Sequence, residues 1–208
     1  MNQDCRRKRA EFIDNSVKVK EAFSFAHPCE KISAVQKYCT SYYGAQLWSM
    51  RADSVSMVNS SWRTHVKLTW DLPRNCHNYF IDTVLAPNET PPAISLPVRF
   101  VNFFQSLQRS PSPEVQILSN LCARDIRTNT GSNLNHIKSL IGLDPGEYGG
   151  KRIKEELRRV LAAEVPVTDH WRLSYLQKLL SNRCKAFYDG DSVHYDYLND
   201  LIYSLVIN

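Results

Sequence analysis

The chain has 208 residues and a formal net charge of +5, with 43% hydrophobic and 23% charged residues. This balance is ordinary for a globular protein that buries its own core, and it excludes a disordered chain of low hydrophobicity. The mild basic excess permits binding to phosphates without requiring it.

A basic cluster precedes the first predicted helix, whose apolar positions begin at Phe12 and Ile13. The cluster consists of four consecutive residues, Arg6, Arg7, Lys8 and Arg9. Three interpretations stay open: a solvated helix face, a contact with nucleic-acid phosphates, and a nuclear-import signal. The next helix is indicated by Ile32 and Val35, and Gly44 is expected to end it or to admit a close neighbour.

The clearest helix follows, with apolar residues three, four, four and four positions apart. They are Val55, Val58, Trp62, Val66 and Trp70. Such a stripe is typical of a helix that packs one face into a core. Asp53 or Ser54 is expected to cap its start, and Pro73 to end it near Asp71.

Two basic residues of the same helix, Arg63 and Lys67, lie one turn apart and away from the apolar stripe. We therefore predict that they form an exposed basic edge, which Arg74 extends beyond the helix. Clustered cations of this kind bind the phosphate backbone of nucleic acids.

Helical patterns continue to the end of the chain. Ser112 and Pro113 begin a helix from which Leu118 is expected to point inward, and a further helix spans residues 131–141. Residues 143–150 hold three of the seven glycines and predict a linker. Three helices follow in residues 151–208. Since strand-type alternation is nearly missing, we predict an all-α fold.

Basic residues recur in the first helix after this linker, at Arg152, Lys154, Arg158 and Arg159. Two interpretations of this run stay open, a solvated face and a contact with nucleic acid.

No arrangement of side chains in the sequence predicts catalysis, a metal site or a cofactor. The six cysteines and six histidines are dispersed, without zinc-type spacing or a nucleophile beside a base. We expect reduced thiols and an intracellular location. A nuclear location is one interpretation of the basic cluster. We expect no membrane span, since no apolar run reaches about 20 residues.

The order of several short motifs resembles one family. These motifs are Tyr38-Cys39, Tyr43-Gly44, Leu47-Trp48, Trp62-Arg63, Leu72-Pro73 with His77, a series at Arg99, Phe103, Leu107 and Ser110, and a group at Gly131, Asn133, Leu134 and Ile137. Together they resemble the region downstream of the reverse transcriptase palm in LINE-type, jockey-like (non-LTR) retrotransposons. The match covers roughly residues 1–140 as an ordered series and extends more loosely to about residue 183.

The resemblance implies an irregular helical array in three parts: thumb-like and post-thumb helices at 1–142, the linker at 143–150, and a C-terminal helical subdomain at 151–208. The polymerase of this family holds its metal ions with a Tyr/Phe-x-Asp-Asp hairpin, which this sequence lacks. We therefore expect a non-catalytic C-terminal fragment of a reverse transcriptase. Its partner would be an RNA or DNA duplex, bound through the cluster at residues 6–9 and through Arg63, Lys67 and Arg74.

Two alternatives remain open. One is a helical interaction module that docks a partner or a second copy through apolar surfaces around residues 100–104 or 195–203. The other is a decayed fragment of a mobile element without any function.

Overall fold

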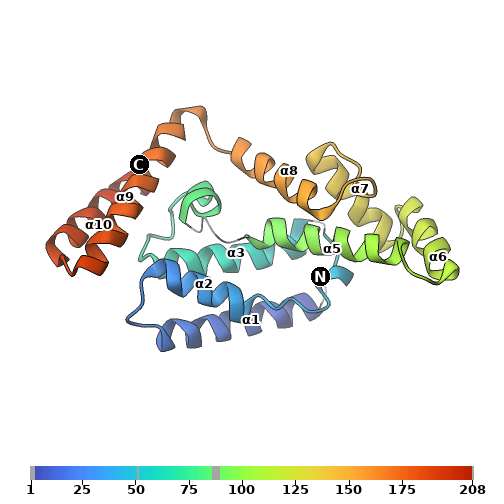
Figure 1. Ribbon diagram of the computed structural model, residues 1–208, viewed down its shortest axis with the longest axis horizontal. Coiled ribbons are helices and arrows are strands. Elements are labelled where there is room, and N and C mark those ends of the chain that lie inside the picture. Colours follow the sequence, from blue (N-terminus) through green and yellow to red (C-terminus); the bar gives the residue numbers. More distant parts are fainter. Residues whose placement is uncertain (1–2, 51, 86–89, 208) are drawn as a thin grey trace. The chain divides into compact units, whose positions relative to one another are not determined.

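The computed structural model describes residues 3–50, 52–85 and 90–207, and all regular structure in these ranges is helical. The prediction of an all-α fold is confirmed. The ten α-helices in this part of the chain are α1 (Gln3–Ala22), α2 (Pro28–Cys39), α3 (Ala52–Thr69), α4 (Asn78–Phe80), α5 (Pro92–Gln108), α6 (Pro113–Arg124), α7 (Asn129–Ile141), α8 (Gly150–Ala163), α9 (His170–Asp189) and α10 (Ser192–Ile207) (Figure 1). Short 3-10 turns at Ala45–Leu47 and Val167–Asp169 and a π-helical turn, η2 (Ile81–Leu85), join them.

The chain divides into two compact units, each assembled from three separated segments. Unit 1 comprises residues 1–10, 41–60 and 90–160, and unit 2 comprises residues 11–40, 61–89 and 161–208. These boundaries differ from the predicted division at residues 143–150, because segments far apart in the sequence pack together in each unit.

The segment predicted as a linker is a folded loop of unit 1. The side-chain amide of Gln105 in α5 donates hydrogen bonds to the carbonyl oxygens of Pro145, at 3.3 Å, and Tyr148, at 2.7 Å. Gly150, at the start of α8, is buried, and a Cβ atom there would lie 2.2 Å from the side-chain oxygen of Asn102. Side chains of α5 therefore hold both ends of this loop.

The apolar stripe of α3 supplies the core of unit 2, as predicted. Trp62, Val66 and Trp70 are at most 3% exposed and belong to one apolar cluster with residues of α9 and α10. Those two helices lie side by side (Figure 1). The tryptophans are thus packed in the interior, where aromatic side chains contribute most to stability.

The sequence prediction is right for the C-terminal end of α3 and wrong for its N-terminal cap. At the C-terminal end, Asp71 takes a left-handed conformation with φ of 53°, and the Leu72 amide donates to the Lys67 carbonyl at 2.8 Å. This is a Schellman-type end at the predicted place. The predicted cap is wrong, because the helix begins at Ala52 and Asp53 therefore lies within its first turn.

Asn133 of α7 holds the segment before α3 in place within unit 1 by hydrogen bonds. Its buried side chain accepts a hydrogen bond from the Met50 amide at 2.7 Å and donates one to the Trp48 carbonyl at 2.8 Å. Gly131 allows α7 to approach closely, since a Cβ there would lie 2.3 Å from the Asp125 carbonyl oxygen. Both residues belong to the motif group noted at positions 131–137, and the structure gives each a packing role.

We expect Asn133→Ala to destabilise unit 1 by about 3 kcal/mol, because it leaves two buried backbone groups without partners. Asn129 offers a matched control, since its exposed amide donates to the Leu47 carbonyl at 2.9 Å from the same helix. Asn129→Ala should cost less than about 1 kcal/mol. Urea unfolding followed by circular dichroism measures both, and equal losses for the two variants would contradict this role.

Candidate functional site

The basic edge predicted on α3 makes its polar contacts inside unit 2. Arg63 donates from Nε to Asp82 Oδ1 at 3.1 Å and from Nη2 to Asp82 Oδ2. The side chain of Asp82 is 2% exposed and that of Arg63 is 20% exposed. This two-bond pair neutralises the arginine and joins α3 to η2. The prediction of an exposed edge is therefore wrong at Arg63.

Lys67 likewise forms hydrogen bonds with the turn that follows α3. Its Nζ donates to the carbonyl oxygens of Arg74, at 2.9 Å, and Cys76, at 2.6 Å. Burial lowers the pKa of its ammonium group below the ordinary value. The lysine therefore closes the turn that contains Pro73. The exposed edge is wrong here too, and of the three predicted residues only Arg74 is exposed.

The N-terminal basic cluster is part of α1 rather than a segment before it. Arg6, Arg7 and Arg9 are exposed and Lys8 is half-buried. Arg7 forms an ion pair with Asp4. The Asp4 carboxylate also accepts a hydrogen bond from the Trp48 indole at 2.8 Å, and that bond and Arg7 lower its pKa. Arg6 and Arg9 lie with Arg7 on the solvent side of α1.

A second basic surface lies on α8 in unit 1. Lys151, Lys154 and Arg158 are spaced by three and four residues, so they share one face of the helix. Ile153 and Leu157, roughly a third of a turn around the helix from these cations, are at most 5% exposed. None of the three cations lies within 4 Å of a carboxylate in the described part of the chain. We call these three residues the α8 stripe.

The other cations of α8 are paired along their own side of the helix. Arg152 lies 2.9 Å from Glu156 and 3.7 Å from Glu155, and Arg159 lies 3.1 Å from Glu156. Glu156 is thus shared by two arginines and Glu155 lies near one, while neither carboxylate lies within 4 Å of the α8 stripe in the described residues. The sequence interpretation of this helix included Lys154 and Arg158 but missed Lys151, which the spacing of three and four residues could have identified.

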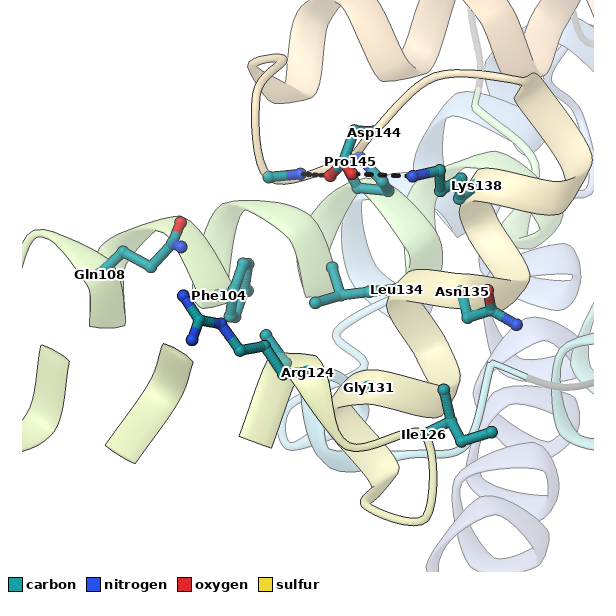
Figure 2. Close-up of a pocket in the computed structure, with 12 residues that line it drawn as sticks. Phe104, Gln108, Arg124, Ile126, Gly131, Leu134, Asn135, Lys138, Asp144 and Pro145 are labelled. Carbon is teal, nitrogen blue, oxygen red and sulfur yellow. Dashed lines mark hydrogen bonds and ion pairs between the residues drawn. The ribbon is translucent and has the colours of Figure 1, made fainter. Parts of the chain in front are cut away.

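Unit 1 also contains a cavity of about 310 Å³ between α5, α6 and α7 (Figure 2). Phe104 and Leu134 give it apolar walls, and the side chain of Arg124 extends toward α5. Lys138 at its rim is paired with Asp144 at 3.1 Å. The volume suits a small ligand, but none of the lining residues is a nucleophile beside a base.

Two histidines are buried in unit 2, and both have structural partners. His27 caps α2, where its Nδ1 accepts from the Cys29 amide at 3.3 Å. His65 lies within α3, with its Nε2 3.2 Å from the Thr69 hydroxyl oxygen. His77, a member of the Leu72-Pro73 motif, stacks its ring on Tyr79 with 5.2 Å between centroids.

No set of three His, Cys, Asp or Glu side chains in the described ranges is arranged to hold a metal ion. The six cysteines, which all lie in those ranges, are free thiols. None of the described helices combines the length and the apolar character needed to cross a bilayer.

Comparison with known proteins adds no relative to this description. No family model, curated protein or solved structure matches the chain.

Proposed function

We propose that this chain binds the phosphate backbone of a nucleic-acid duplex without regard to base sequence, and that the α8 stripe makes the main contacts. The observation that carries the proposal is the set of three cations on one helix face without carboxylate partners in the described part of the chain. From residue 151 to residue 158 the helix rises about 10 Å, at about 1.5 Å per residue. That length matches about three phosphates of one strand.

The electrostatics of α8 favour an anionic partner. Gly150–Ala163 holds five basic and two acidic residues, and neighbouring like charges one turn apart destabilise a helix by about 0.2–0.5 kcal/mol per pair. A bound phosphate relieves this repulsion. Arg6 and Arg9 on α1, together with Arg74, are the further exposed cations that we assign to phosphate contact. We assign Arg63 and Lys67 to stability instead, because their donors are used within unit 2.

The resemblance to LINE-type reverse transcriptases supports the same function. A thumb holds the template–primer duplex and performs no chemistry. We therefore propose a non-catalytic, thumb-like and post-thumb region whose remaining capacity is duplex binding.

Binding to labelled RNA–DNA and DNA duplexes, measured against salt, tests the proposal. We expect equal affinity for duplexes of unrelated sequence and a loss of about 0.9 log units of affinity per phosphate contact for each decade of salt with B-DNA. The absence of binding at low salt would contradict the proposal. So would an affinity that does not change with salt.

A helical interaction module is the second candidate, with a surface that differs in part from the predicted ones. Phe100 and Phe104 are core residues, each 2% exposed, so these two side chains do not contribute to the surface predicted around 100–104. On α10, Tyr197 and Tyr203 are 58% and 48% exposed. A partner that docks there would bind without dependence on salt, which separates this candidate from phosphate binding.

A further inference from the structure

A second cavity, of about 160 Å³, is lined by residues of unit 2 alone. Arg183 of α9, which forms part of its wall, is 2% exposed. Two further lining residues, Asp71 just after α3 and Asp200 on α10, are exposed to solvent. The cavity therefore runs from an acidic, exposed mouth to a buried cation at its inner end.

The buried guanidinium of Arg183 has no counterion among the described residues. Its Nη1 donates to the side-chain oxygen of Asn199, whereas its Nε and Nη2 are buried there without a hydrogen-bond partner. The rings of Trp70 and Tyr195 lie 4.3 Å and 5.3 Å from Cζ, measured to their centroids. These cation–π contacts favour the charge but give the two N–H groups no acceptor. Because buried donors and buried charges are ordinarily paired, this edge of the guanidinium suits an anionic partner.

The unpaired edge has the geometry that recognises a carboxylate. The N–H bonds of Nε and Nη2 are parallel and form a fork that matches the two oxygens of a carboxylate. The same chain uses this fork elsewhere in unit 2, where Nε and Nη2 of Arg63 hold the carboxylate of Asp82. The group expected at the inner end of the cavity is therefore a carboxylate.

The mouth of the cavity favours a positive charge on the same ligand. Asp71 and Asp200 have no ion-pair partner in the described part of the chain, and they outnumber the single guanidinium of Arg183 in the lining. A simple anion such as phosphate would pass two like charges on entry, whereas an ammonium group would be attracted to them. A ligand that carries both a carboxylate and an ammonium group satisfies both ends.

We propose that this cavity binds a small zwitterionic amino acid. Its carboxylate lies against the Nε–Nη2 edge of Arg183, and its ammonium group faces Asp71 and Asp200. Leu72 and Ile202, which are 8% and 1% exposed, supply an aliphatic wall for a short side chain. The cavity is smaller than the roughly 300–1,000 Å³ of pockets for drug-sized ligands, so the ligand is of the size of alanine or valine. This inference is independent of duplex binding, because the α8 stripe belongs to unit 1.

Titration of the full chain with L-alanine and two truncated probes tests the ligand class. Propionate keeps the carboxylate without the ammonium group, and ethylamine keeps the ammonium group without the carboxylate. The indole N–H signal of Trp70 in the NMR spectrum is the local readout, because Trp70 lines the cavity. We expect L-alanine to shift it with a dissociation constant on the order of 1 mM, and each probe to bind at least about tenfold more weakly. No shift with L-alanine, or equally tight binding of propionate, would overturn the proposal.

Matched double variants test the mouth of the cavity. Asp71→Asn with Asp200→Asn removes both carboxylates, and asparagine tolerates the left-handed backbone at position 71. Asp189→Asn with Asp196→Asn removes two exposed carboxylates of α9 and α10 that do not line the cavity. The first variant should bind L-alanine at least about tenfold more weakly, and the second should bind it as the unmodified chain does. Equal affinities of the two variants would overturn the proposal.

Arg183→Lys tests the inner end of the cavity, because lysine keeps the charge and loses the two-bond edge. Its affinity for L-alanine should fall at least about tenfold. Arg172→Lys, on the same helix but outside the cavity, is the control and should leave the affinity unchanged. Circular dichroism establishes that each variant is folded, and the mouth variants decide the matter where Arg183→Lys is not. A folded Arg183→Lys variant with unchanged affinity would overturn the proposal.

Discussion

Acidification from pH 7 to pH 4 is expected to destabilise unit 2 by several kcal/mol, because two buried histidines must gain protons. His27 and His65 are 0% and 7% exposed. Burial lowers the pKa of both side chains to about 4, and a nearby cation adds to this in each case, Arg183 for His27 and Lys20 for His65. At His27 a proton on Nδ1 would also remove the acceptor that caps α2.

The direction of the effect follows from proton binding. In the unfolded chain a histidine titrates near pH 6.5, whereas each buried histidine stays neutral until about pH 4. Between these values the unfolded state holds more protons, so falling pH shifts the equilibrium toward it. The stability is fully present above pH 6.5 and is lost progressively as the pH falls to 4. The full shift corresponds to a loss on the order of 3 kcal/mol per histidine.

Urea unfolding at a series of pH values between 7 and 4 measures this loss. His27→Asn keeps a capping acceptor but does not titrate, so it should remove about half of the pH dependence in this window. The exposed His194 provides the control, and His194→Gln should leave the pH profile unchanged. An unfolding free energy that stays constant from pH 6.5 to pH 4.5 would contradict this account.

Arg63→Ala is expected to destabilise unit 2 by about 3 kcal/mol, because it leaves the buried Asp82 carboxylate without its counterion. The double variant Arg63→Ala with Asp82→Ala should recover part of that loss, since it removes the unpaired charge as well. Arg74→Ala, at an exposed position, is the control and should change stability by less than about 0.5 kcal/mol.

Thermal and urea unfolding of these three variants, of Asp82→Ala and of the unmodified chain gives these values. If Arg63→Ala proves as stable as Arg74→Ala, the pair with Asp82 contributes nothing and an external role for Arg63 returns. Additive losses in the double variant would also argue against a direct pair.

The helices of this chain could be predicted because their signals are local. The spacing of Val58, Trp62 and Val66 identifies α3 and its buried face without knowledge of any other helix. Ser112 was predicted to cap α6, and its hydroxyl accepts from the Val115 amide. Asp191, just before α10, accepts in the same way from the His194 amide. Each of these interactions spans only a few residues.

The candidate site could be predicted less well, because it depends on partners far away in the sequence. Arg63 meets Asp82 nineteen residues later, beyond the turn at Pro73, so the spacing on α3 gave no sign of neutralisation. Asn133 binds backbone groups more than eighty residues before it. Leu118, predicted to point inward, is 62% exposed, since the helical period alone does not say which face meets the core.

The salt dependence of duplex binding by two matched variants tests the central claim most directly. Lys151→Gln with Arg158→Gln removes two cations seven residues apart from the α8 stripe. Lys178→Gln with Lys185→Gln removes two exposed cations at the same spacing from α9. We expect the slope of log affinity against log salt to fall by about 1.8 for the α8 variant, two contacts at about 0.9 each, and to stay unchanged for the α9 variant. Equal slopes for the α8 variant and the unmodified chain would contradict the assignment of the α8 stripe to phosphate binding.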